Sequence, residues 1–138
     1  MHTYSVALRI SGPDLDLTEA SDALKLDPTQ TRVIGQPIHS SDRVWPESMW
    51  EYEVRPAGGE VVWDSLEEGL RTVISTFVPC ERELRKYQRR YKVFLWCAHF
   101  SASFDGGPTF SPQLLKILGD FGVELILDTY FSNEQESD

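Results

Sequence analysis

Two loop segments of this 138-residue chain carry polar side chains whose types could bind an anion or move a proton. The segments span 27–48 and 104–110, and the candidate ligand-binding residues in them are Arg32, His39, Arg43 and Asp105. Arginine binds a carboxylate or a phosphate through paired N–H donors, and the glycines after Asp105 let backbone N–H groups approach a ligand. One hypothesis is therefore a small anionic-ligand site or enzyme site between these loops. Turn glycines and solvated loop side chains without a function are the alternative.

Motifs that fix a catalytic chemistry are absent from the sequence. Neither phosphate-binding pattern, GxGxxG or GxxxxGK[ST], occurs, and there is no GxSxG nucleophile elbow. The three histidines lack HExxH or cysteine-pair spacing, so we predict no metal site and no cofactor. Cys80 and Cys97 are compatible with a disulfide, but two free thiols in a reducing cytosol are the simpler interpretation. These features favour a protein that is not an enzyme.

A basic segment, residues 81–92, contrasts with the formal net charge of −9 for the whole chain. On a helical wheel its apolar residues share one stripe, and the basic residues Arg82, Arg85, Lys86 and Arg89 lie opposite. A solvated helix face explains this pattern without a partner. A docking surface for an acidic protein or a nucleic acid is the functional alternative.

The overall charge narrows the classes of partner. An acidic chain repels phosphate backbones, so a nucleic acid is disfavoured, whereas a basic protein partner is favoured. No apolar run approaches the roughly 20 residues that span a bilayer, so we predict no membrane partner. The N-terminal residues alternate like a strand and lack a basic region typical of a signal peptide, which predicts a cytoplasmic protein.

The hydrophobic periodicity predicts four strands and several helices. Strands are expected at 4–10, 49–55, 91–104 and 123–131, where apolar residues alternate or run together. Helices are expected at 18–26, 64–78, 80–90 and 112–121, where apolar residues recur at helical spacing. Expected N-terminal caps are Thr18, Asp64 paired with Glu67, and Ser111.

This order of elements predicts an α+β fold. We expect a split βαβ, ferredoxin-like arrangement, in which a four-stranded, mainly antiparallel sheet carries the helices and an extra helical segment lies between the halves. The strand at 91–104 is apolar on both faces, which predicts a central strand covered on both sides. A single domain should span 1–131, followed by an acidic, disordered tail at 132–138.

Two stretches resemble the bacterial family known as domain of unknown function 4279. They are "YSVALRISGPDLDLTEASDALKLDPTQTRVIGQP" near the start and "FSPQLLKILGDFGVELILDTYF" near the end, so the resemblance covers nearly the whole chain. One departure is Ile34, where the family pattern tends to have lysine. The resemblance implies a small bacterial cytoplasmic protein. It supplies no catalytic residues, because the family has no established activity.

The leading functional hypothesis is a non-enzymatic protein-interaction domain of immunity or adaptor type. Its size, its acidic balance and the missing catalytic motifs all favour this class. Aromatic residues that could anchor a partner are Trp45 and Trp50, and the basic residues of 81–92 could add to the contact. A homodimer is compatible with this hypothesis and with the ligand-binding alternative.

Overall fold

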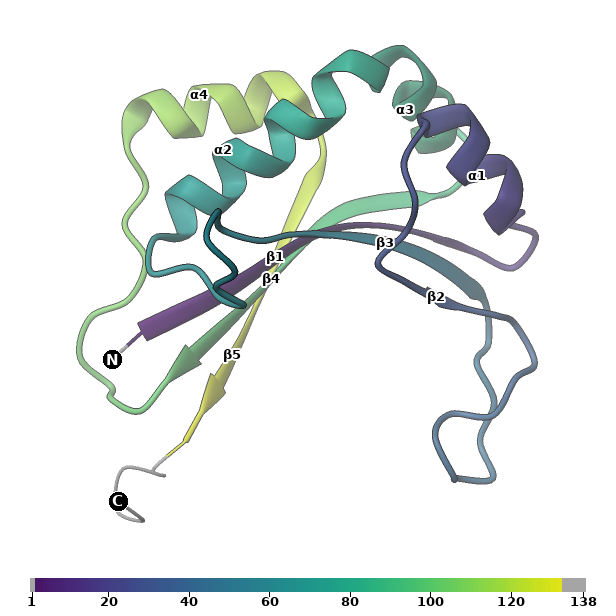
Figure 1. The fold of residues 1–138 in the computed structure, drawn as a ribbon, viewed down its shortest axis with the longest axis horizontal. Coiled ribbons are helices and arrows are strands. Elements are labelled where there is room, and N and C mark those ends of the chain that lie inside the picture. The colour runs from purple at the N-terminus through teal and green to yellow at the C-terminus, as the bar shows by residue number, and fades with distance from the viewer. Residues whose placement is uncertain (1, 133–138) are drawn as a thin grey trace.

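The structure is a computed structural model that describes residues 2–132. One five-stranded sheet carries all the helices on a single side, as Figure 1 shows. The buried hydrophobic residues form a core between the helices and the sheet, and β1 contributes Tyr4, Val6, Leu8 and Ile10 to it. The predicted tail at 132–138 lies outside the described residues, apart from Ser132.

The strands follow the spatial order β2-β3-β1-β4-β5. Their bounds are β1 His2–Gly12, β2 Gln30–Arg32, β3 Ser48–Val54, β4 Lys92–Ser101 and β5 Glu124–Phe131. All neighbours pair antiparallel except β4 and β5, which are parallel. A parallel pair needs a long crossover connection, and the segment that contains α4 provides it.

The helices are α1 Leu17–Leu24, α2 Leu66–Phe77, α3 Glu81–Gln88 and α4 Pro112–Phe121, with a short 3₁₀ turn, η1 Val78–Cys80, between α2 and α3. Each α-helix buries an apolar stripe against the sheet or a neighbouring helix. In α2 the buried apolar side chains are those of Leu66, Leu70, Val73, Ile74 and Phe77. This periodicity is the one that the sequence predicts for 64–78.

The ferredoxin-like prediction is wrong, although the α+β class holds. The sheet has a fifth strand, because β2 forms inside the segment that the sequence assigns to an irregular loop. The sheet is mixed because β4 and β5 are parallel. That segment also contains a hairpin, in which Pro37 pairs with Val44. Three residues in β2 are too few for hydrophobic periodicity to reveal a strand.

The place of β4 in the sheet also differs from the prediction. The central strand is β1, and helices cover only one side of β4, so Phe100 on the other side is 38% exposed. The apolar residues on both sides of β4 suggested two covering layers. One of those layers is missing from the described residues.

Two of the predicted helix caps belong to neighbouring residues. Asp16, rather than Thr18, caps α1 by accepting a hydrogen bond from the Glu19 backbone N–H. Ser65, rather than Asp64, caps α2. Ser111 caps α4 as predicted, and the helix ends at Gly122, whose positive φ of 71° favours glycine.

Candidate functional site on the open face of the sheet

We call the side of the sheet that faces away from the helices the open face (Figure 1). Strand alternation places every second side chain on it. Its central residues are Arg9 and Ser11 from β1, Met49 and Glu51 from β3, Phe94, Trp96 and Phe100 from β4, and Asp128 and Tyr130 from β5. The open face therefore combines charged and aromatic side chains without a covering layer.

A chain of polar contacts crosses the open face from β3 to β5. Arg9 Nε donates to Glu51 Oε1 at 2.6 Å, and the Arg9 guanidinium lies 4.0 Å from the centre of the Trp96 ring. The Trp96 indole N–H donates to Asp128 Oδ2 at 2.8 Å. Because the Trp96 indole is held by two neighbours, its orientation is fixed before any partner arrives.

Aromatic side chains continue this surface toward the end of β4. The rings of Phe100 and Tyr130 stack at 5.7 Å, and Tyr130 is 50% exposed. Parallel pairing sets these two residues side by side in register. Exposed, stacked aromatic residues beside a fixed tryptophan form an apolar patch that is suited to a binding surface.

At the other end of the open face lies a cavity of about 240 Å³, which we call the arginine pocket. One row of paired strand residues forms its floor: Arg32, Met49, Ser11 and Lys92, from β2, β3, β1 and β4. Arg9 and Phe94 lie in the next row, and Trp45, Pro46 and Glu47 form a wall before β3. The strand register thus brings three cations together.

Arg32 is partly buried and stacks on an aromatic ring, and it forms no ion pair with another described residue. Its guanidinium lies 4.2 Å from the centre of the Trp45 ring, and its Nε is buried with no hydrogen-bond partner among the described residues. Burial lowers the pKa of Arg32, and the nearby charge of Arg9 lowers it further, while Glu51 opposes the shift. The side chain stays protonated, since arginine titrates far above neutral pH.

The four predicted ligand-binding residues do not share a pocket. Arg32 lines the arginine pocket. His39 and Arg43 are exposed near the tip of the hairpin, where the Ile38 N–H bonds to the Arg43 carbonyl. Asp105 follows the far end of β4, and Figure 1 shows the two loops at opposite ends of the sheet.

Sequence reasoning missed the pocket residues Arg9, Ser11 and Lys92. A signal for them exists, because they are polar positions on the outward side of strands that also bury an apolar side. That signal shows which side of a strand they occupy. It does not show which strands are neighbours, and the pocket depends on that order.

The residues predicted to contact a partner are distributed over several surfaces. Trp45 is half-buried against Arg32, whereas Trp50 is fully buried and donates its indole N–H to Ser21 Oγ. Trp50 is therefore not an exposed anchor.

On α3, Leu84 and Tyr87 are buried and the basic side chains face outward, as the wheel predicts. Arg85 pairs with Glu81 and Lys86 with Glu83, while Arg82 and Arg89 are exposed. Pairing within the helix supports a solvated face, because exposed pairs of this kind need no partner.

A second polar cluster lies at the end of β4 that is far from the arginine pocket. His2 Nδ1 and His99 Nε2 are 2.8 Å apart, and His2 Nε2 lies 2.6 Å from the Asp105 carbonyl oxygen. Burial and the neighbouring His2 lower the pKa of His99. No group of three or more metal-binding side chains is present among the described residues.

The two cysteines are free thiols. Burial raises the pKa of Cys97 to about 12, so its thiol is protonated at neutral pH and is a poor nucleophile. Within residues 2–132, no helix has the length and apolar character needed to cross a membrane.

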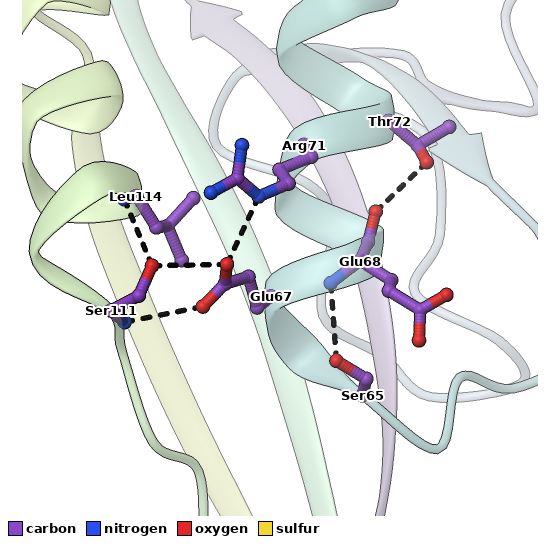
Figure 2. Close-up of polar contacts among 7 residues, drawn as sticks. All are labelled: Ser65, Glu67, Glu68, Arg71, Thr72, Ser111 and Leu114. Carbon is purple, nitrogen blue, oxygen red and sulfur yellow. Dashed lines mark hydrogen bonds and ion pairs between the residues drawn. The ribbon is translucent and has the colours of Figure 1, made fainter.

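On the helix side, Glu67 joins α2 to α4, as Figure 2 shows. Its carboxylate accepts hydrogen bonds from the Ser111 backbone N–H at 3.2 Å, from Ser111 Oγ at 3.0 Å and from Arg71 Nε at 3.0 Å. The backbone bond from Ser111 is the main reason why the pKa of Glu67 is lowered. Glu67 therefore has a structural role.

Comparison with protein families identifies the class of this chain. Residues 2–132 match the family described as domain of unknown function (DUF4279). The chain belongs to this family, and the resemblance seen in the sequence is confirmed. Comparisons with curated proteins and with solved structures give no significant match.

Proposed function

We propose that this chain is a non-enzymatic protein-interaction domain, of immunity or adaptor type, that binds its partner through the open face. The single observation that carries this proposal is Trp96, which is fixed by Arg9 and Asp128 yet has no helix above it. Tryptophan, tyrosine and arginine dominate the binding energy of protein interfaces. All three residue types meet on this surface.

Preorganisation strengthens the proposal. A side chain that is already held in its bound orientation loses little conformational freedom when a partner binds. The contact from Arg9 and the hydrogen bond to Asp128 restrict the Trp96 ring in the absence of a partner. The sheet beneath it also sets neighbouring strands at a defined spacing, so Phe100 and Tyr130 stack beside it.

The charge of the open face points to the chemistry of the partner. The net charge of −9 predicts a basic partner, but the arginine pocket gathers Arg9, Arg32 and Lys92 on the binding surface itself. We propose that the contacting segment of the partner presents apolar side chains toward Trp96 and at least one acidic group toward the pocket. A cytoplasmic location and a bacterial source, both expected from the sequence, are consistent with this proposal.

The test compares variants of the open face with a matched variant on the helix side. Trp96→Ala and Tyr130→Ala should each abolish retention of a stoichiometric partner from a host lysate, whereas Leu115→Ala on α4 should retain it. Leu115 is 55% exposed and serves as the control. A photo-crosslinker placed at Phe100 should capture the partner, and one placed at Leu115 should not.

Thermal unfolding of each variant separates lost binding from lost folding. Tyr130→Ala is the safer variant, because half of the tyrosine surface is already exposed. Retention of the partner by both folded open-face variants, together with crosslinking from Leu115, would overturn the proposal and move the interface to the helices.

A further inference from the structure

We propose that the arginine pocket binds a carboxylate group, with Arg32 as the main donor and the apolar wall of the pocket receiving the group attached to that carboxylate. The inference rests on the proposed function in one respect, because we assign the carboxylate to the segment of the protein partner that covers the open face. The binding chemistry of the pocket can be tested without that partner.

The first observation is that the Arg32 Nε–H group has no hydrogen-bond acceptor among the described residues. Nearly all buried polar groups in native proteins are hydrogen-bonded, so a buried donor with no acceptor among the described residues is open to an acceptor from outside the chain. Arg32 Nε is such a donor among the described residues. The side chain as a whole is only partly buried and lines the cavity, so a ligand can reach the guanidinium.

The second observation is the charge balance of the pocket. Its lining includes three cations, Arg9, Arg32 and Lys92, but only one acid, Glu47. Arg9 is already neutralised by Glu51, whereas Arg32 forms no ion pair with any described residue. The Lys92 ammonium group lies 5.0 Å from the centre of the Phe94 ring and forms no ion pair with residues 2–132. In an acidic chain, this cluster attracts an anion.

The third observation concerns the type of anion. A planar carboxylate matches the fork of an arginine side chain and accepts two parallel N–H bonds. Glu47 lines the pocket and Glu51 lies beside it, and both repel a doubly charged phosphate more strongly than a singly charged carboxylate. The remaining walls are apolar, from Trp45, Met49 and Phe94, so the group that carries the carboxylate should be apolar near the charge.

The test is a titration of the isolated, ¹⁵N-labelled chain, followed by NMR. The probe is N-acetyl-L-leucine, which has a carboxylate beside an apolar side chain, and its uncharged amide is the matched control. We expect a saturable shift of the Arg32 Nε–Hε signal and of the Trp45 indole signal, with a dissociation constant on the order of 1 mM for so small a ligand. The amide should leave both signals unchanged.

Two variants localise the binding. Arg32→Gln should weaken binding of the probe by about 10-fold or more, since it removes a charge-assisted pair. Arg82→Gln is the control, because Arg82 is exposed on α3, away from the pocket. Equal shifts with the amide, tighter binding of inorganic phosphate, or no saturable shift at Arg32 would each overturn the inference.

The outcomes also separate this inference from the proposed function. If the probe fails to bind but Trp96→Ala still loses the partner, the inference is wrong and the interaction proposal stands. If the probe binds at Arg32 while open-face variants keep the partner, the pocket binds the carboxylate of a small molecule and not that of the protein partner. That result overturns the assignment of the carboxylate to the partner.

Discussion

Glu67 on the helix side and Arg32 on the open face differ in how completely their charged groups are hydrogen-bonded within the chain. Glu67 accepts three hydrogen bonds, two from Ser111 and one from Arg71, and this joins α2 to α4. Arg32 has its Nε buried with no acceptor in the part of the chain that the structure describes. The satisfied charge maintains the fold, and the unsatisfied charge lies where the sheet has no cover.

This difference distinguishes polar side chains that stabilise the fold from polar side chains that are available to bind a partner. A polar group that serves stability is expected to have its hydrogen bonds completed within the chain. A binding surface instead keeps donors and aromatic rings available, at some cost in stability. The comparison therefore predicts that substitutions on the helix side mainly change stability, whereas substitutions on the open face mainly change binding.

The largest expected change in stability comes from a comparison of substitutions on the two sides of β4. Leu95 of β4 is fully buried beneath the helices, so Leu95→Ala should lower the free energy of unfolding by about 2–5 kcal/mol. Phe100 of the same strand lies on the open face, and Phe100→Ala should cost about 1 kcal/mol at most. Urea unfolding measures both. Equal losses would mean that the open face is as well packed as the core.

The next effect concerns the Arg9–Glu51 ion pair, which is well buried on the open face. Glu51 and Arg9 have side chains that are 6% and 13% exposed. Glu51→Gln removes the negative charge that neutralises Arg9 beside the arginine pocket. We therefore expect the free energy of unfolding to fall by about 2 kcal/mol. This value lies below the range for a fully buried pair, because Arg9 keeps some contact with water. Added sodium chloride should restore part of this loss by screening the cations. A stability unchanged by both substitution and salt would contradict the charge balance described for the pocket.

Glu67 should give a smaller, pH-dependent effect. Its pKa is lowered from an ordinary value of 4.5, mainly by the Ser111 backbone N–H, so the ionised form is favoured in the folded state. The stability that it contributes is complete above the unfolded pKa and is lost as the pH falls through the folded pKa. Melting temperatures measured from about pH 6 down to about pH 3 should therefore fall more steeply for the parent chain than for Glu67→Gln. Parallel curves for the two proteins would show that the link between α2 and α4 does not depend on this charge.

Much of the helix side can be predicted from the sequence, because local signals determine it. The periodicity of α2 and the Ser111 cap of α4 are confirmed, since apolar spacing and capping depend on neighbouring residues. The predicted end of this helix at residue 121 also matches the structure, in which Gly122 follows the last helical residue. The strands β1, β3, β4 and β5 occur where alternation predicts them, within a few residues.

The open face is harder to predict, because it depends on strand order. Arg9 and Arg32 belong to strands that are not neighbours, and β3 joins them by placing Glu51 and Met49 between them. No local pattern encodes that order. The sequence identified Arg32 as a ligand-binding candidate but grouped it with His39 and Arg43 near the hairpin tip and with Asp105 at the other end of the sheet. It also placed Trp50 among the exposed anchors, although strand alternation turns this residue into the core.

The smallest effect on stability is expected at the centre of the proposed carboxylate site. Arg32→Gln removes the stacking of the guanidinium on Trp45. It also removes a partly desolvated charge and a buried donor that has no acceptor within residues 2–132. These opposing terms should leave the free energy of unfolding within about 0.5 kcal/mol of the parent value. A chain that keeps its stability and loses carboxylate binding would confirm that Arg32 is held ready for a ligand. A large loss of stability, measured by urea unfolding, would mean instead that Arg32 supports the fold, as Glu67 does.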